Sequence, residues 1–150
     1  MLTMTYQSPI GPLYIAERDG AITHLVFKPI TGQAGETALL AKCAAQLDAY
    51  FAGELQDFDL PLAPKGTAFQ ARVWQMLRTI PYGTTWSYKM LAEAAGSPRG
   101  YRAVGLANNK NPISILIPCH RVVGASGALT GYGGGLSNKE FLLKLEDRTP

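Results

Sequence analysis

The chain has 150 residues and a formal net charge of +3; 47% of its residues are hydrophobic and 17% are charged. Such a composition is ordinary for a globular protein with one or two small domains. No apolar run reaches the roughly 18 residues that a membrane span needs, and residues 1–11 lack the basic and apolar regions of a secretory signal. We therefore expect no membrane contact and a cytoplasmic location, or a nuclear one in a eukaryote.

The first part of the chain is expected to form a small α/β domain, a mainly antiparallel sheet with one helix. Three strand-like runs separated by turn residues predict hairpins; they span residues 2–6, 12–17 and 21–27. A helix is expected from about Glu36 to Phe51, and a last strand over 57–60. The proline-rich stretch that follows predicts a linker, so we divide the chain into domains at 1–62 and 63–150.

From residue 67 onward the pattern is helical, which predicts a mainly α second domain. Three hydroxyl side chains can each cap a helix that follows them: Thr67, Ser87 and Ser97. The expected helices run over 68–77, 88–95 and 98–108, with Pro98 opening the third. The last two make a helix-turn-helix pattern of the winged-helix kind. Because helix corners in many enzymes have similar spacing, the pattern alone leaves DNA binding open.

The rest of the second domain surrounds a polar tetrapeptide. An apolar, β-branched run over 113–117 is typical of a buried strand and ends in Pro-Cys-His-Arg, residues 118–121. A glycine-rich stretch follows over 124–135. Ser137 and Glu140 then form a capping-box pattern, which predicts a last helix through Leu145.

Cys119 is the residue best placed for chemistry, because polar groups adjoin it where the apolar run stops. A free thiol is only slightly ionised at neutral pH, so a nearby base such as His120 would activate it, and a carboxylate such as Glu146 would orient that base. A lone cysteine at the end of an apolar run is more commonly inert core, and Cys43 on the apolar helix face fits that reading. His24 is expected to be a strand residue without a chemical role.

Six motifs, in order, resemble the O6-alkylguanine-DNA alkyltransferase family. The segment 111–122, Asn-Pro-Ile-Ser-Ile-Leu-Ile-Pro-Cys-His-Arg-Val, is similar to that family's active-site signature. The other five lie at residues 80–83, 87–88, 102–105, 130–135 and 139–146. The resemblance is strong over about residues 67 to 146, while the N-terminal part matches only in its general layout.

The resemblance implies direct-reversal DNA repair. An alkyl group would move irreversibly, in a single turnover, from O6-alkylguanine, and from O4-alkylthymine, to Cys119 as the nucleophile. His120 would deprotonate the thiol through a water, and Glu146 would orient His120. Asn111 would brace the turn that carries the cysteine, and Tyr88 would donate a hydrogen bond toward the leaving base.

The resemblance also implies minor-groove binding and a base flipped out of the duplex. Arg102 would fill the space that the base leaves, and Ala103, Ser97 and Tyr88 would contact DNA. The substrate pocket is expected to comprise Tyr132, Gly133 and Val122 together with Cys119. Many relatives have serine where this chain has Gly133, so rate or substrate preference is expected to differ there.

The expected partner is double-stranded DNA that contains alkylated guanine, and the chain is expected to act as a monomer. No metal or other cofactor is expected, because the zinc-bearing members of the family use N-terminal cysteines and histidines, where this chain has only His24 and Cys43. Three alternatives remain: an alkyltransferase-like protein that binds lesions without repairing them, a transcriptional regulator, and a cysteine hydrolase with a Cys-His-Glu triad.

Overall fold

A computed structural model describes residues 1–148 of the chain. Its N-terminal part is a four-stranded sheet with the order β3-β2-β1-β4. Strands β1 (Leu2–Ser8), β2 (Gly11–Arg18) and β3 (Ala21–Val26) form two antiparallel hairpins, and the short β4 (Gln33–Ala34) pairs in parallel with β1. Asp19 and Gly20 turn the second hairpin with positive φ angles of 51° and 78°, as a tight hairpin turn requires.

Helix α1 (Ala38–Phe51) follows the sheet and buries one apolar face against it. Thr37 begins the helix, because its hydroxyl accepts a hydrogen bond from the Leu40 backbone N–H at 3.0 Å. Gly53, with a φ of 76°, lies just past the end of the helix. The fold class predicted for this part, a mainly antiparallel sheet with one helix, is confirmed.

The predicted strand over 57–60 is wrong: these residues form an irregular segment. The side-chain amide of Gln46 bonds both the backbone N–H and the carbonyl of Asp59, at 2.9 and 3.1 Å, where a neighbouring strand would otherwise pair. The chain joins the sheet edge only afterwards, where the Ile22 N–H donates to the carbonyl of Pro61 and the Ile22 carbonyl accepts from Ala63 N–H.

The C-terminal part is mainly helical, as predicted. Its α-helices are α2 (Ala68–Leu77), α3 (Tyr88–Ala94), α4 (Tyr101–Asn109) and α5 (Leu136–Arg148). Two short 3-10 turns, η1 (Cys119–Arg121) and η2 (Ala125–Gly127), and the parallel pair β5 (Trp86–Ser87) and β6 (Val122–Val123) complete it. Thr67 and Ser87 cap their helices as predicted.

Two predicted helix starts are wrong. Helix α4 begins at Tyr101 rather than at Pro98, because residues 97–100 form a turn in which the Gly100 N–H donates to the Ser97 carbonyl at 2.8 Å; the Ser97 side chain caps no helix. Helix α5 begins at Leu136, so Ser137 lies inside it and forms no capping box. The Lys139 N–H already bonds the carbonyl of Gly135, whose φ is 94°, so the helix starts two residues earlier than predicted.

The apolar run over 113–117 is buried as predicted, but it is a turn and not a strand. The Ile117 N–H donates back to the Ile113 carbonyl at 3.0 Å, and Ile115 adopts a φ of 72°. A β-branched residue rarely takes this left-handed conformation, so the turn is locally strained next to Cys119.

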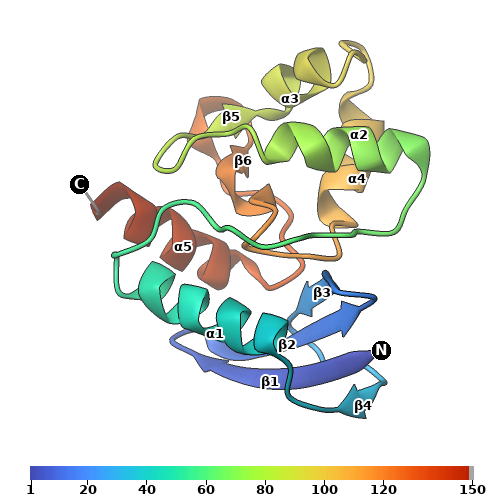
Figure 1. Cartoon of the computed structure of the whole chain (residues 1–150). Helices are drawn as coiled ribbons and strands as arrows, with labels where there is room; N and C mark the ends of the chain where they lie inside the picture. Colours follow the sequence, from blue (N-terminus) through green and yellow to red (C-terminus); the bar gives the residue numbers. More distant parts are fainter. Residues whose placement is uncertain (149–150) are drawn as a thin grey trace.

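The two parts of the chain share one hydrophobic core. Figure 1 shows α1 over the N-terminal sheet, with α5 beside it and α2, α3 and α4 beyond. Strand β3 also bonds the turn before the cysteine, since Leu25 exchanges backbone hydrogen bonds of 2.9 Å with Pro112 and Ser114. The division at residues 62 and 63 stays a prediction, and residues 149–150 lie outside the described part. Within residues 1–148, no helix is long and apolar enough to cross a membrane.

Candidate active site

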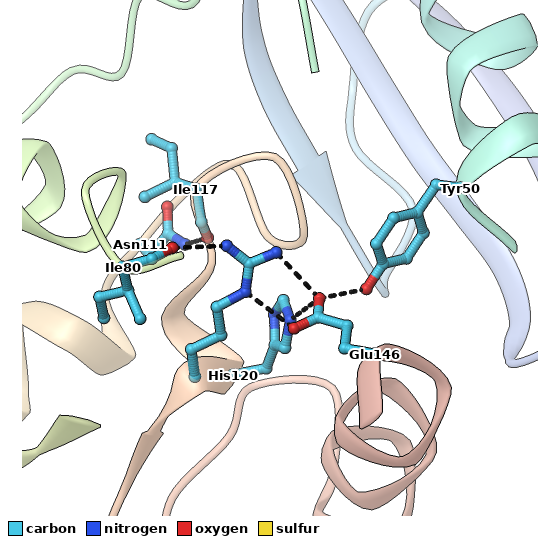
Figure 2. A network of polar contacts seen from close by, with 7 residues as sticks. Tyr50, Ile80, Asn111, Ile117, His120 and Glu146 are labelled. Atoms are coloured by element: carbon cyan, nitrogen blue, oxygen red, sulfur yellow. Dashed lines mark hydrogen bonds and ion pairs between the residues drawn. The ribbon is translucent and has the colours of Figure 1, made fainter. Parts of the chain in front are cut away.

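Asn111 holds the turn that leads to Cys119. Its amide nitrogen donates to the Ile117 carbonyl at 2.8 Å, and its side-chain oxygen accepts from the Ile113 N–H at 3.0 Å. Figure 2 shows Asn111 directed at Ile117. The strained turn is thereby closed from inside by one side chain, and Cys119 follows as the first residue of η1 with 5% of its surface exposed.

His120 and Glu146 are in direct contact in the interior, with 2.7 Å between Nε2 and a carboxylate oxygen. Burial raises the pKa of Glu146, but His120 and Arg121 outweigh it and hold that pKa at about 2. An ionised carboxylate only accepts hydrogen bonds, so Nε2 of His120 carries the proton and Nδ1 presents a lone pair. Nδ1 is buried and makes no hydrogen bond to any residue of the described part. This tautomer is the one that a base acting through Nδ1 requires.

Two residues that the sequence did not single out complete the environment of Glu146. Arg121 donates to both carboxylate oxygens, from Nε at 2.8 Å and from a terminal nitrogen at 3.0 Å, and its other terminal nitrogen donates to the Ile80 carbonyl. The Tyr50 hydroxyl, from α1, donates to Glu146 at 2.6 Å (Figure 2). In the sequence Tyr50 looks like one more apolar-face residue, and only the fold brings it to Glu146.

Lys139 is a third residue that sequence reasoning missed, and it is fully buried. Its ammonium donates to the carbonyls of Val122 and Thr130 at 2.6 and 2.7 Å, so it ties α5 to β6 and to the glycine-rich loop. Burial raises the pKa of Cys119, while the Asn111 hydrogen bond and the charge of Lys139 act in the opposite direction. In the sequence, Lys139 lies between a glycine-rich stretch and the apolar residues Phe141 and Leu142. No periodic pattern there indicates that its side chain is buried.

The predicted pocket residues lie on the glycine-rich loop and on β6. Tyr132 packs edge-on against Phe27 of the N-terminal part, with ring centroids 5.7 Å apart. A Cβ atom at Gly134 would come within 2.5 Å of the same Phe27 ring, whereas one at Gly133 would meet nothing within 4 Å. Val122 is buried, and its carbonyl already accepts from Lys139.

The predicted DNA-contacting residues gather around α3 and α4. Arg102 and Ala103 are exposed on α4, and Ser97 is half-buried in the preceding turn. The Tyr88 hydroxyl accepts a hydrogen bond from Thr130 at 3.1 Å. A shallow, mainly apolar hollow joins these elements; it is lined by Tyr88, Tyr101, Arg102, Gly105, Leu106, Asn109, Thr130 and Gly131.

The structure thus brings Cys119, His120, Asn111 and Glu146 into one cluster and puts Tyr88 and Arg102 at a neighbouring surface. Among residues 1–148, no group of three or more histidine, cysteine, aspartate or glutamate side chains could hold a metal ion. Cys43 lies apart, fully buried, and burial raises its pKa to about 12.

Comparison with known proteins shows the family of the chain. Residues 1–64 match the profile of the 6-O-methylguanine DNA methyltransferase, ribonuclease-like domain, and residues 68–148 match the DNA binding domain of the same family. A methylated-DNA–protein-cysteine methyltransferase of Methanosarcina barkeri is 53% identical over 148 residues, which cover 94% of each chain. A protein of that name from Mycolicibacterium paratuberculosis is 53% identical, covering 96% of this chain and 91% of the relative.

Solved structures give the same result. Mycobacterium tuberculosis OGT in complex with DNA superposes with a TM-score of 0.91 at 49% identity, covering 98% of this chain and 93% of that one. The O6-methylguanine methyltransferase of the same organism superposes with a TM-score of 0.90 at 48% identity, covering 99% and 93%. The chain therefore belongs to the 6-O-methylguanine DNA methyltransferase family.

Proposed function

We propose that this chain repairs double-stranded DNA by moving an alkyl group from O6 of guanine to the sulfur of Cys119, once per molecule. Family membership supports the general activity, transfer of an alkyl group from DNA to a protein cysteine. The observation that supports Cys119 as the acceptor is its place beside the buried His120–Glu146 pair, joined at 2.7 Å. Cys43, the other cysteine of the sequence, lies in the hydrophobic core, and burial raises the pKa of its thiol to about 12.

The chemistry follows from the tautomer of His120. Nδ1 takes the thiol proton through a bridging water, and the thiolate attacks the alkyl carbon. A C–S bond forms as the C–O6 bond breaks, and the guanine leaves with a hydrogen bond or proton supplied at the base. The product is a thioether, which water does not cleave, so each molecule acts once. No tetrahedral intermediate forms, and no oxyanion hole is needed.

The target base must leave the duplex to reach a cysteine that is 5% exposed. We propose that α4 enters the minor groove, where the small Ala103 allows close approach and Arg102 fills the vacated space. Ser97 contacts DNA at the start of this region. Tyr88 donates toward the base, and Tyr132, Gly133 and the carbonyls of Cys119 and Val122 line the pocket. O4-alkylthymine fits the same chemistry. The protein is proposed to act as a monomer, without a metal or cofactor, in the cytoplasm or in a nucleus.

Intact-mass measurement and peptide mapping test this function. Reduced protein is incubated with excess duplex DNA that contains one O6-methylguanine. We expect one added methyl group per chain, on the peptide with Cys119, and no further turnover. Cys119→Ala should lose transfer yet keep DNA binding, and Cys43→Ala is the matched control that should still react. Three outcomes would reject the proposal. The methyl group could be found on Cys43 alone, the folded and reduced protein could remain unmethylated after incubation, or one molecule could turn over repeatedly.

A further inference from the structure

We propose that Tyr50, on helix α1 of the N-terminal part, is a positioning residue for alkyl transfer: its hydroxyl fixes the Glu146 carboxylate in the orientation that makes His120 a base. This inference rests on the proposed function. It assigns to the N-terminal part a direct role in the chemistry, because Tyr50 and Glu146 are 96 residues apart in sequence and meet in the interior.

The hydrogen bonds around the Glu146 carboxylate show why Tyr50 matters. One oxygen, Oε1, accepts from Nε of Arg121 at 2.8 Å. The other, Oε2, accepts from the Tyr50 hydroxyl at 2.6 Å, from His120 Nε2 at 2.7 Å and from Arg121 at 3.0 Å. Tyr50 and His120 therefore share one oxygen. Without the hydroxyl, the direction of that oxygen's lone pairs toward His120 would depend on Arg121 alone.

The ring of Tyr50 is held so that its hydroxyl has little freedom. It is fully buried among aromatic rings, with centroids 5.3 Å from Phe51, 5.3 Å from Phe58 and 6.3 Å from Tyr82. The Tyr82 ring in turn faces the Arg121 guanidinium, whose central carbon is 5.6 Å from the ring centroid. Tyr50 thus contacts the carboxylate directly and also packs on the aromatic ring that supports Arg121.

The expected chemical effect has a sign. The ionisable groups that interact with Glu146 or His120 are Tyr50 on α1, Arg121 on η1, Tyr132 on the glycine-rich loop and Lys139 on α5; Tyr82, before β5, interacts with Tyr50. Removing the Tyr50 donor makes the carboxylate more basic and leaves more of its charge for His120. The pKa of His120 should then rise. Only neutral His120 accepts the thiol proton. In the profile of transfer rate against pH, the acidic limb, where the rate falls as His120 is protonated, should therefore move to higher pH.

Tyr50→Phe in the full chain tests this, with Tyr6→Phe as matched control. Tyr6 is also buried against α1, and its hydroxyl also donates to a carboxylate, that of Asp48, away from Glu146. We expect Tyr50→Phe to slow methyl transfer from O6-methylguanine duplex by about tenfold, less than the ~10²-fold or more that a general base itself contributes. Its acidic limb should shift to higher pH, and Tyr6→Phe should leave rate and limb unchanged.

Nitrogen-15 NMR of His120 in the free protein gives a readout independent of activity: the Nδ1 and Nε2 shifts should report a changed proton distribution in Tyr50→Phe only. If Tyr50→Phe does not fold, Tyr50→3-fluorotyrosine is used instead, because it keeps the ring and makes the hydroxyl a stronger hydrogen-bond donor. The acidic limb of the pH–rate profile should then move to lower pH. An unchanged rate, limb and tautomer in a folded Tyr50 variant overturn this inference, as do equal changes in Tyr6→Phe. Absence of transfer in the unmodified protein would instead reject the proposed function.

Discussion

The buried polar cluster around Glu146, here called the relay, and the exposed face of α3 and α4 differ in burial and in hydrogen bonding. The relay comprises Tyr50, Cys119, His120, Arg121 and Glu146, each at most 6% exposed and most of them joined by hydrogen bonds of 2.6 to 3.0 Å. On the face, Tyr101 and Leu106 are 47% and 64% exposed, and its hollow is mainly apolar.

This difference separates two kinds of contribution. A polar group in the relay cannot be changed without leaving a buried partner unpaired, so stability and chemistry are coupled there. A side chain on the face makes few contacts within the protein, so it can serve DNA binding at little cost to the fold. Substitutions in the relay should therefore lower both the unfolding free energy and the transfer rate, whereas substitutions on the face should slow repair and leave the unfolding free energy almost unchanged.

Glu146→Gln should give the largest effect and should lower both the stability of the protein and the rate of alkyl transfer. The substitution keeps the size of the side chain but leaves the buried Arg121 without its anionic partner, which costs roughly 3–5 kcal/mol of unfolding free energy. Transfer should slow on the order of 10²–10⁴-fold, because His120 loses the group that orients it. Urea unfolding and single-turnover rates at neutral pH measure the two losses.

Acid unfolding provides the control for that variant. In the folded protein the pKa of Glu146 is about 2, below its ordinary 4.5, so its contribution to stability is complete above pH 4.5 and disappears as the pH falls toward 2. Glu146→Gln should lack this part of the acid dependence. A variant as stable as the parent, with the same acid dependence, would contradict the coupling of stability and chemistry in the relay.

Arg102→Ala should leave unfolding free energy within about 0.5 kcal/mol of the parent, because Arg102 is exposed. Repair within a duplex should slow roughly ten- to a hundredfold, since base flipping costs a few kcal/mol and each 1.4 kcal/mol is about tenfold. Reaction with a free O6-alkylguanine base should be unaffected. Lys110→Ala, which removes a charge just past the end of the same helix and outside the hollow, is the matched control. Equal slowing with duplex and free base would exclude the flipping role.

The smallest effects are expected at two adjacent glycines between these regions. Gly134→Ala should destabilise by about 1–3 kcal/mol, because the new methyl group would press on the Phe27 ring at 2.5 Å and displace the aromatic partner of Tyr132. Gly133→Ala should stay within about 0.5 kcal/mol, since nothing lies within 4 Å of its Cβ position. Thermal unfolding of both variants measures the difference. Similar losses at both positions would show that the loop is constrained by its backbone and not by Phe27.

The sequence predicted those features that local patterns encode. The short strands between turn residues, the apolar face of α1 and the hydroxyl caps at Thr67 and Ser87 depend on neighbouring residues, and the structure confirms each of these predictions. The start of α4 was misjudged because a serine followed by proline suits either a helix start or a turn, and packing around residues 97–100 selects the turn. Glu146 was one candidate carboxylate in the sequence, and the family resemblance assigned it to His120, because spacing alone could not bring the two together.

The supporting residues could not be predicted in the same way. Tyr50 occupies a helix position that fits an apolar core. Arg121 is the last residue of the Pro-Cys-His-Arg motif, in which only Cys119 and His120 suggested chemistry. Lys139 reads as an ordinary charge near the start of a helix, yet it is fully buried. Each acquires its partner through a contact between distant segments, for which sequence periodicity carries no signal.

The Tyr50–Glu146 contact also bears on folding kinetics. It joins residues 96 apart, and the β3 pairing with Pro112 and Ser114 joins segments almost as distant. Such non-local contacts raise the contact order and slow the final folding steps. During refolding from denaturant, ability to accept an alkyl group should therefore return with the docking of α1 on α5, after most helical signal has recovered. An incompletely folded molecule contains the Cys119 thiol but lacks the arrangement of His120, Glu146 and Tyr50 that activates it.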